Sequence, residues 1–322
     1  MSTVLAFVEH EHGEPTETSL EAITLARRVA TGTDSVLGAV AFGAEGAGVA
    51  EHLGAHGVEV VHHVEGSDDY APQAWGEGLS ELVSDLDAEA VVAPGSDRGH
   101  EVLTHAAAGQ DLPMAANCTE VEVGETYELT RQRWGGSLVE HARLEAPTKL
   151  LTAAEHELPI EEADDATDPA VETFEPDLED GHRRVSLDRL EESDVEGVPL
   201  GEARVVVGGG RGVGGPDGYD QLEELADLLG GAVGASRAAV NEGWRPHDDQ
   251  VGLTGTKISP DLYIACGISG AVQHMVGCKG ADRILAINTD PEAAIMQKAE
   301  YAVVGDLHEV VPELNEAIRG ER

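Results

Sequence analysis

The stretch GASRAAVNEGWRPHDDQVGLTGTKISPDLYIACGISGAVQH, residues 234–274, carries the chain's densest set of side chains suited to touch a ligand. Within it, GASR (234–237) follows a short apolar run, VGLTG (251–255) is a turn of small residues with one hydroxyl, and SGAVQH (269–274) follows the run LYIACGI. Each segment is typical of the carboxyl end of a strand that meets a loop or a helix. In an open α/β sheet ligands bind at that edge, and helix N-termini there suit a phosphate.

Strand-like and helix-like segments alternate along the rest of the chain. Apolar residues at helical spacing from Ala22 to Val29 and from Leu222 to Leu229 predict helices, with a final helix from 306 to 318. The alternation predicts an α/β fold of two domains, an N-terminal parallel-sheet, nucleotide-binding-like domain and a C-terminal Rossmann-like domain. Short apolar runs predict the strands at residues 4–8, 36–41, 58–61, 90–93, 204–207, 232–233, 262–266, 284–287 and 301–304.

The boundary between the two domains is expected near Asp194, which gives domains of residues 1–193 and 194–322. An acidic segment precedes it, with twelve Asp and Glu residues between positions 155 and 180 and few apolar residues among them. We expect this segment to be interdomain. Residues 171–174 and 184–187 are candidates there for short edge strands.

The charge of the chain is extreme. Its 322 residues include 62 acidic and 20 basic residues, only four of them lysine, for a formal net charge of -42. Such a surface repels nucleic acid and anionic membranes. The acids are dispersed among segments with apolar periodicity, which indicates a folded protein rather than a disordered one. Few lysines with many acids are typical of adaptation to high salt, where the Debye length falls to about 3 Å.

The cysteine usage indicates a reducing, cytoplasmic protein. The three cysteines form no CxxC pair, so we expect buried thiols rather than disulfides. The opening segment MSTVLAFVEH runs directly into a strand-like pattern with no cationic leader, and no apolar run reaches the roughly 18 residues of a membrane span.

A glycine-rich turn follows the predicted strand at 204–207. Its Gly210-x-Gly212-x-x-Gly215 pattern matches a dinucleotide-binding fingerprint, which expects an acidic residue at the end of the next strand. That place holds GASR, and Arg237 suits a 2′-phosphate, so an NADP-binding oxidoreductase domain is one interpretation. The chain offers no catalytic acid–base pair to go with it, and the glycines also suit a plain flexible turn.

Together with AINTDPEAAIMQKAEYAVVGDL (286–307), these motifs resemble the alpha subunit of electron transfer flavoprotein. The resemblance is strong over residues 205–312 and weaker but collinear over the N-terminal part. It implies an electron carrier with no small-molecule substrate of its own, whose C-terminal domain binds FAD and whose N-terminal domain packs on a homologous beta subunit. Electrons would pass from acyl-CoA or similar dehydrogenases of fatty acid oxidation to a membrane-bound quinone reductase.

The resemblance also assigns roles to single residues. It places Arg237 against the isoalloxazine ring, Ser236 on the pyrophosphate, Thr254 beside flavin N5 and His274 beside the pyrimidine carbonyl. The setting of Arg237 agrees with this, because a cation at a helix start opposes the helix dipole unless something anionic or π-rich compensates it. The remaining FAD contacts that the resemblance implies are Arg211, Val251, Gly252, Leu253, Ser269, Gly270, Ala271, Val272, Gln273, Asn288, Asp306 and Leu307.

Position 253 departs from the family, which commonly has glutamine where this chain has Leu253. A backbone contact there survives the change and a side-chain contact does not. Asp306 also suits a plain helix N-cap. The sequence contains no paired histidine spacing typical of a metal site and no hydrolytic motif. A third interpretation, a non-catalytic nucleotide-binding or scaffold protein, stays open beside the flavoprotein and the NADP domain.

Overall fold

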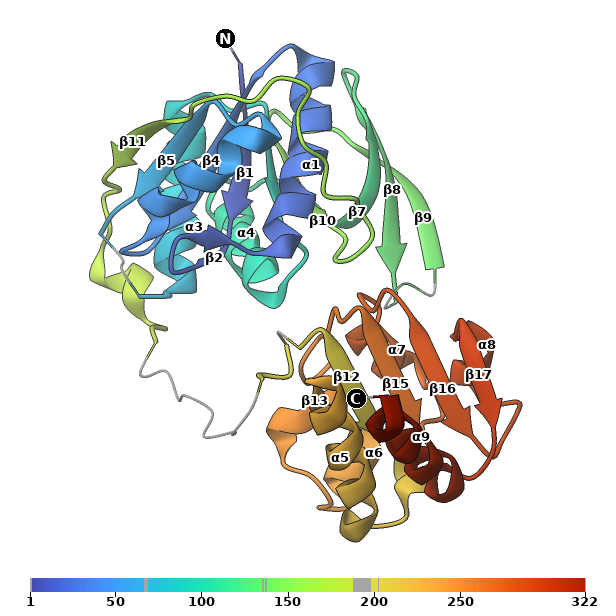
Figure 1. Cartoon of the computed structure of the whole chain (residues 1–322). Helices are drawn as coiled ribbons and strands as arrows, with labels where there is room; N and C mark the ends of the chain where they lie inside the picture. The colour runs from blue at the N-terminus through green and yellow to red at the C-terminus, as the bar shows by residue number, and fades with distance from the viewer. Residues whose placement is uncertain are drawn as a thin grey trace. The chain divides into compact units, whose positions relative to one another are not determined.

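The computed structural model describes residues 2–66, 69–134, 136, 138–187, 198–201 and 203–321 (Figure 1). The chain divides into two units, residues 1–190 and 191–322. The boundary that the sequence places at Asp194 lies outside the described residues. Cys118, Cys266 and Cys278 are free and buried, as expected. Within the described residues, no helix is both long and apolar enough to cross a membrane.

The N-terminal unit is built on a nine-stranded sheet in the order β11-β5-β4-β1-β6-β10-β7-β8-β9. The strands from β11 to β7 are parallel, as the alternation of strands and helices predicts. The bounds are β1 Thr3–Val8, β4 Val36–Phe42, β5 Val60–Val64, β6 Ala90–Ala93, β7 Met114–Glu122, β8 Tyr127–Arg133, β9 Leu138–Leu144, β10 Lys149–Ala153 and β11 Ala170–Phe174, with a short hairpin of β2 His10–Glu11 and β3 Glu14–Pro15.

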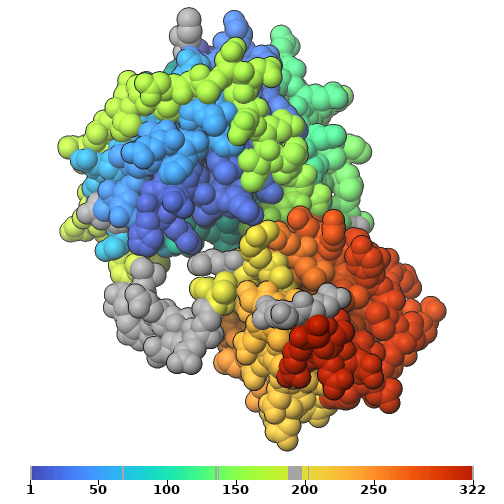
Figure 2. Space-filling model, viewed as in Figure 1, coloured from blue at the N-terminus to red at the C-terminus, as the bar shows by residue number. Residues whose placement is uncertain are grey.

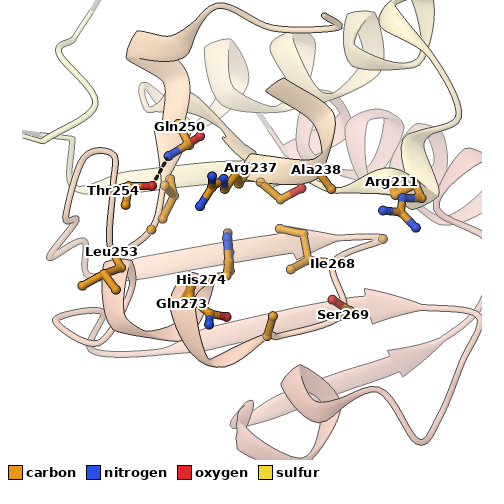
Figure 3. A pocket seen from close by; sticks show the side chains of 15 residues that line it. Arg211, Arg237, Ala238, Gln250, Leu253, Thr254, Ile268, Ser269, Gln273 and His274 are labelled. Atoms are coloured by element: carbon orange, nitrogen blue, oxygen red, sulfur yellow. Dashed lines mark hydrogen bonds between the residues drawn. The ribbon is translucent and has the colours of Figure 1, made fainter. Parts of the chain in front are cut away.

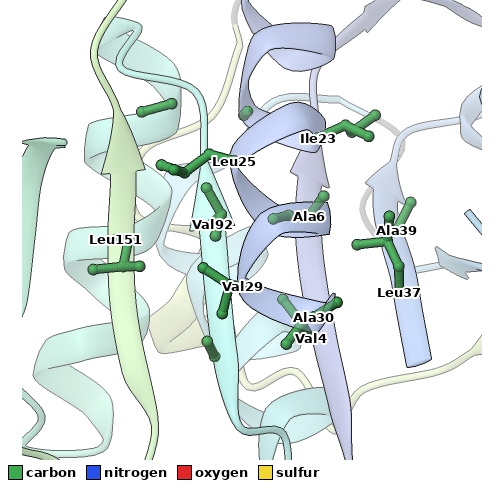
Figure 4. Packing of buried hydrophobic residues seen from close by; sticks show 14 of the residues in the cluster. Val4, Ala6, Ile23, Leu25, Val29, Ala30, Leu37, Ala39, Val92 and Leu151 are labelled. Carbon is green, nitrogen blue, oxygen red and sulfur yellow. The ribbon is translucent and has the colours of Figure 1, made fainter. Parts of the chain in front are cut away.

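Helix α1 shows how the sequence sets the layers of this unit. Thr16 caps it by accepting a hydrogen bond from the backbone N–H of Ser19. The apolar side chains then recur along one face and pack on the sheet, so that Leu25 and Val29 lie over β1, β6 and β10 (Figure 4). The helices of the unit are α1 Glu17–Thr33, α2 Ala50–Leu53, α3 Pro72–Asp85 and α4 Asp97–Gly109, with 3-10 turns η1 Gly46–Val49, η2 Gly54–His56 and η3 Asp180–Arg183.

The acidic segment 155–180 is part of this unit and not a free connection, which corrects its expected interdomain place. It lies across the surface of the unit (yellow-green in Figure 2). Arg27 donates hydrogen bonds to the backbone carbonyls of both His56 and Glu161, and the Thr167 N–H donates to the Gly54 carbonyl. The edge strand expected at 171–174 is confirmed as β11, whereas the strand expected at 184–187 is wrong.

The sheet also carries an antiparallel arm that the sequence did not predict. Strands β7, β8 and β9 pair as an antiparallel meander at one edge. Across β8 and β9, Arg131 contacts Glu140 at 2.7 Å and Arg143 contacts Glu128 at 2.9 Å. Charged side chains on both faces hide the alternation that marks a half-buried strand, so the sequence carries no strand signal for β8 and β9.

The C-terminal unit is a six-stranded parallel sheet in the order β14-β13-β12-β15-β16-β17. The strand order reverses between β12 and β15, so that their loops leave toward opposite faces and open a crevice at the carboxyl edge. The strands are β12 Val205–Gly209, β13 Ala232–Ser236, β14 Gln250–Val251, β15 Leu262–Cys266, β16 Ile284–Asn288 and β17 Tyr301–Val304. The helices are α5 Asp220–Leu229, α6 Arg237–Asn241, α7 Val272–Gly277, α8 Ala294–Lys298 and α9 Leu307–Glu321, with 3-10 turns η4 Arg211–Val213, η5 Pro216–Tyr219 and η6 His247–Asp249.

Candidate functional site

A cavity of about 380 Å³ opens at the carboxyl edge of the C-terminal sheet, beside the point where the strand order reverses (Figure 3). The segments that follow β12, β13 and β15 meet there, together with β14 and the loop after it. This is the edge at which the sequence placed the ligand site. The wall is made by Arg211, Ser236, Arg237, Ala238, Gln250, Val251, Gly252, Leu253, Thr254, Gly267, Ile268, Ser269, Ala271, Gln273 and His274.

Two arginines supply the positive charge of the cavity. Arg211 opens η4 directly after β12, and Arg237 is the first residue of α6 after β13. Neither has an ion-pair partner among the residues that the structure describes, although the chain has 62 acidic residues. Arg245 in the same unit, by contrast, forms ion pairs with Glu223 and Asp249. Two guanidinium groups left unpaired in one cavity favour an anionic ligand.

Ser236 joins β13 to α6. It is the N-cap residue, and its side-chain oxygen accepts a hydrogen bond from the Ala239 N–H at 3.4 Å. This cap ends the strand and begins the helix within one residue, which places Arg237 at the cavity wall. The helix start that the sequence predicts at GASR is therefore confirmed.

The turn after β14 is held tightly against α7. The Leu253 N–H donates to the Gln273 carbonyl at 2.8 Å, so the backbone donor of Leu253 is used within the protein while its side chain lines the cavity. The Gln250 side-chain amide donates to Thr254 Oγ1 at 3.1 Å (Figure 3). Because that oxygen accepts from Gln250, the hydroxyl hydrogen of Thr254 is left for a ligand acceptor.

His274 lies at the first turn of α7, buried between the cavity and the core. Its Nε2 is 2.8 Å from the hydroxyl of Tyr263 on β15. Its Nδ1 is buried without a hydrogen-bond partner among the described residues. Burial lowers the pKa of His274 to about 4, which the backbone of Val251 opposes in part. The ring is therefore neutral near pH 7 and can donate one hydrogen bond but carries no charge.

The glycines after β12 serve packing rather than a dinucleotide fingerprint. A Cβ atom on Gly210 would lie 2.3 Å from the Gly267 carbonyl oxygen, and one on Gly212 would lie 2.7 Å from the Gly267 Cα. The next helix, α5, begins only at Asp220, after two 3-10 turns. In a dinucleotide-binding fingerprint, the helix that follows the strand begins at the glycines themselves. The geometry therefore disfavours the NADP interpretation.

Most predicted contacts meet at the cavity, and five are placed away from its wall. Gly270 packs beneath Ile295, Val272 is 48 % exposed, and Leu307 is buried in the core. Asn288 and Asp306 have local bonds instead: the Asn288 amide donates to the Ile268 carbonyl, and the Asp306 carboxylate accepts from the His308 N–H. Four wall residues were missed by the sequence analysis, although each adjoins a predicted one: Ala238, Gln250, Gly267 and Ile268.

The wall fits a flavin nucleotide. A buried polar atom without a partner is uncommon in proteins, so the free Nδ1 of His274 points to a ligand acceptor beside it. Arg211 and Arg237 offer charge for phosphates or for the electron-rich ring, while Ile268 and Leu253 add apolar surface. Within the described residues, no group of three or more His, Cys, Asp or Glu side chains is arranged to hold a metal ion.

Comparisons with known proteins agree with this chemistry. Residues 199–279 match the family model "Electron transfer flavoprotein FAD-binding domain", and residues 4–179 match "Electron transfer flavoprotein domain". The electron transfer flavoprotein subunit alpha of Thermoanaerobacterium thermosaccharolyticum is 35% identical, over 97% of this chain and 96% of its own. The Bacillus subtilis alpha subunit is 32% identical over 98% of this chain and 97% of its own. The mitochondrial subunit of Dictyostelium discoideum is 34% identical over 99% and 92%.

Proposed function

The chain belongs to the electron transfer flavoprotein alpha-subunit family, and we propose that its C-terminal unit binds FAD in the cavity between Arg211 and His274. The observation that carries this proposal is the pair of cavity arginines that have no ion-pair partner among the described residues of a strongly acidic chain. Guanidinium groups at a cavity wall with no carboxylate partner among the described residues attract an anionic or π-rich ligand, and FAD provides both kinds of group.

Bound FAD supplies the electron storage, because no protein side chain in the cavity carries out redox chemistry. The residues of the chain bind and tune it. Arg237 stabilises negative charge on the ring, Thr254 donates its hydroxyl hydrogen toward N5, and His274 donates from its neutral imidazole toward the pyrimidine carbonyl. Ser236 and Ser269 provide hydroxyls for the phosphate chain, and Asn288 and Asp306 are proposed for the adenosine end, beyond the cavity wall.

The electron partners are proposed from the family alone. We propose acyl-CoA or similar dehydrogenases as donors and a membrane-bound quinone reductase as acceptor. A homologous beta subunit is proposed to pack on the N-terminal unit, whose described residues include no group of three or more His, Cys, Asp or Glu side chains arranged to hold a metal ion. The net charge of -42 supports the further proposal of a cytoplasmic protein of a salt-adapted cell.

The test is to purify the chain with its beta subunit and measure flavin absorbance, FAD stoichiometry and anaerobic reduction by an acyl-CoA dehydrogenase with its substrate. We expect about one FAD per heterodimer, with much weaker FAD retention when Arg211 and Arg237 are both changed to Gln. Arg204→Gln is the matched control, since this exposed arginine pairs with Asp261 in the same unit. A colourless complex that binds NADPH would contradict the proposal.

A further inference from the structure

Tyr263 occupies an unusual position in the sheet of the C-terminal unit. Its ring on β15 is fully buried, and its hydroxyl lies against Gly208 of the neighbouring strand β12. A Cβ atom at Gly208 would lie 2.2 Å from that hydroxyl oxygen. The next residue, Gly209, makes the same room for Tyr219 on the opposite face, where a Cβ would lie 2.5 Å from the ring. The paired glycines of β12 therefore admit one tyrosine on each side of the sheet.

The two tyrosines differ in what they bind. Tyr219 donates to the Gly209 carbonyl at 2.9 Å, a contact within its own core. The hydroxyl of Tyr263 has one partner among the described residues, Nε2 of His274 at 2.8 Å. Burial raises the pKa of Tyr263 well above its ordinary value, so the phenol keeps its hydrogen.

These facts fix where the hydrogens lie. A buried hydroxyl donates its hydrogen whenever an acceptor is in reach, and Nε2 is the acceptor that the structure offers to Tyr263. A neutral imidazole that accepts at Nε2 carries its own hydrogen at Nδ1. Nδ1 of His274 is buried and makes no well-aligned hydrogen bond among the described residues. The Val251 backbone, which partly opposes the lowering of the His274 pKa, is the competing acceptor for its hydrogen. The arrangement therefore leaves a weakly used donor on a residue of the cavity wall.

We propose that Tyr263 is a positioning residue that holds His274 in the Nδ1–H tautomer, and that this hydrogen is the donor His274 offers to FAD. The identity of the ligand rests on the proposed function, whereas the tautomer is a property of the chain alone. Gly208 has a role in this arrangement, because its missing side chain leaves room for the Tyr263 hydroxyl that sets the tautomer of His274. A histidine left without Tyr263 would be free to expose an acceptor nitrogen to the ligand instead.

The first test is made on the ligand-free full chain with ¹⁵N-labelled histidine. Two-bond and three-bond ¹H–¹⁵N correlation spectra distinguish the tautomers, and the His274 signals are identified by their loss in His274→Gln. We expect Nδ1–H in the wild type, loss of that pure state in Tyr263→Phe, and no change in Tyr219→Phe, the matched control. A wild-type spectrum of the Nε2–H tautomer overturns the proposal, even if Tyr263→Phe fails to fold.

The second test measures the dissociation constant of FAD for the complex with the beta subunit. Loss of a preorganised donor should weaken binding about five- to tenfold in Tyr263→Phe and leave Tyr219→Phe within about twofold of wild type. Equal affinities for wild type and Tyr263→Phe would overturn the donor role. Failure of the wild type itself to bind FAD would instead overturn the proposed function and leave the tautomer result standing.

Discussion

Lowering the pH from 7 to 5 should destabilise the C-terminal unit through a single side chain, His274. Burial lowers its pKa from 6.5 to about 4. As the pH falls below 6.5, the unfolded chain binds a proton at this residue, while the folded chain does not until about pH 4. The unfolded state then holds more protons, so the free energy of unfolding decreases as the pH falls through this window.

The size of the effect follows from the two pKa values. At pH 5 the difference in proton binding costs the folded state about 2 kcal/mol, because each pKa unit is worth about 1.4 kcal/mol. His274 is only 7 % exposed, so solvent screens little of this cost. An effect of this size is a large fraction of the stability of an ordinary domain.

The assay compares wild type with His274→Gln in ligand-free protein at constant molar KCl. Hydrogen–deuterium exchange of β12 and β15 peptides, corrected for the intrinsic exchange rate at each pH, gives the opening free energy of this unit. We expect the wild type to lose about 2 kcal/mol more than His274→Gln between pH 7 and pH 5. Burial also lowers the pKa of His62, but this residue is present in both proteins, so its contribution cancels in the comparison. Identical pH dependence in the two proteins would refute the burial argument.

Three further outcomes are expected. Arg237→Gln should weaken FAD binding by about 1.5–3 kcal/mol and lower the flavin potential, measured by calorimetry and redox titration, because a charge-assisted contact is lost; unchanged values would remove Arg237 from the site. Glu21→Gln should stabilise the N-terminal unit by roughly 3 kcal/mol at pH 8 and little at pH 4.5. Burial raises the pKa of Glu21 to about 7, so the stability of the wild type falls as the pH rises through 4.5 to 7. A melting-temperature difference between variant and wild type that is the same at pH 8 and pH 4.5 would contradict this prediction. Raising KCl from 0.01 M to molar should raise the melting temperature, since the Debye length falls from about 30 Å to about 3 Å around a charge of -42; a flat response would exclude salt adaptation.

Local signals in the sequence predicted most of the parallel strands and the edge at which the site lies. The strands β13, β14 and β15 end at Ser236, Val251 and Cys266, next to the segments that the sequence analysis singled out, and these ends meet at one cavity because parallel strands share their carboxyl edge. The motif signal was less reliable, since Gly210 and Gly212 match a fingerprint but pack against another loop.

The contacts that tune the site depend on partners distant in the chain, and local patterns do not contain them. The approach of Tyr263 to His274 needs the gap that Gly208 leaves on the neighbouring strand. The support of Thr254 by Gln250 depends on the shape of a turn rather than on residue type. The antiparallel arm of β8 and β9 was missed because charged residues such as Arg131 and Glu140 interrupt the apolar alternation of its strands.

The central claim is that FAD occupies the cavity at the carboxyl edge of the C-terminal sheet. Its most direct test is hydrogen–deuterium exchange of the complex with the beta subunit, stripped of FAD and then reloaded. We predict that FAD slows exchange in the peptides covering residues 208–214, 234–240, 250–256 and 266–275, and leaves the arm at 114–144 unchanged. If FAD binds while those four segments exchange at their ligand-free rates, the cavity is not its site.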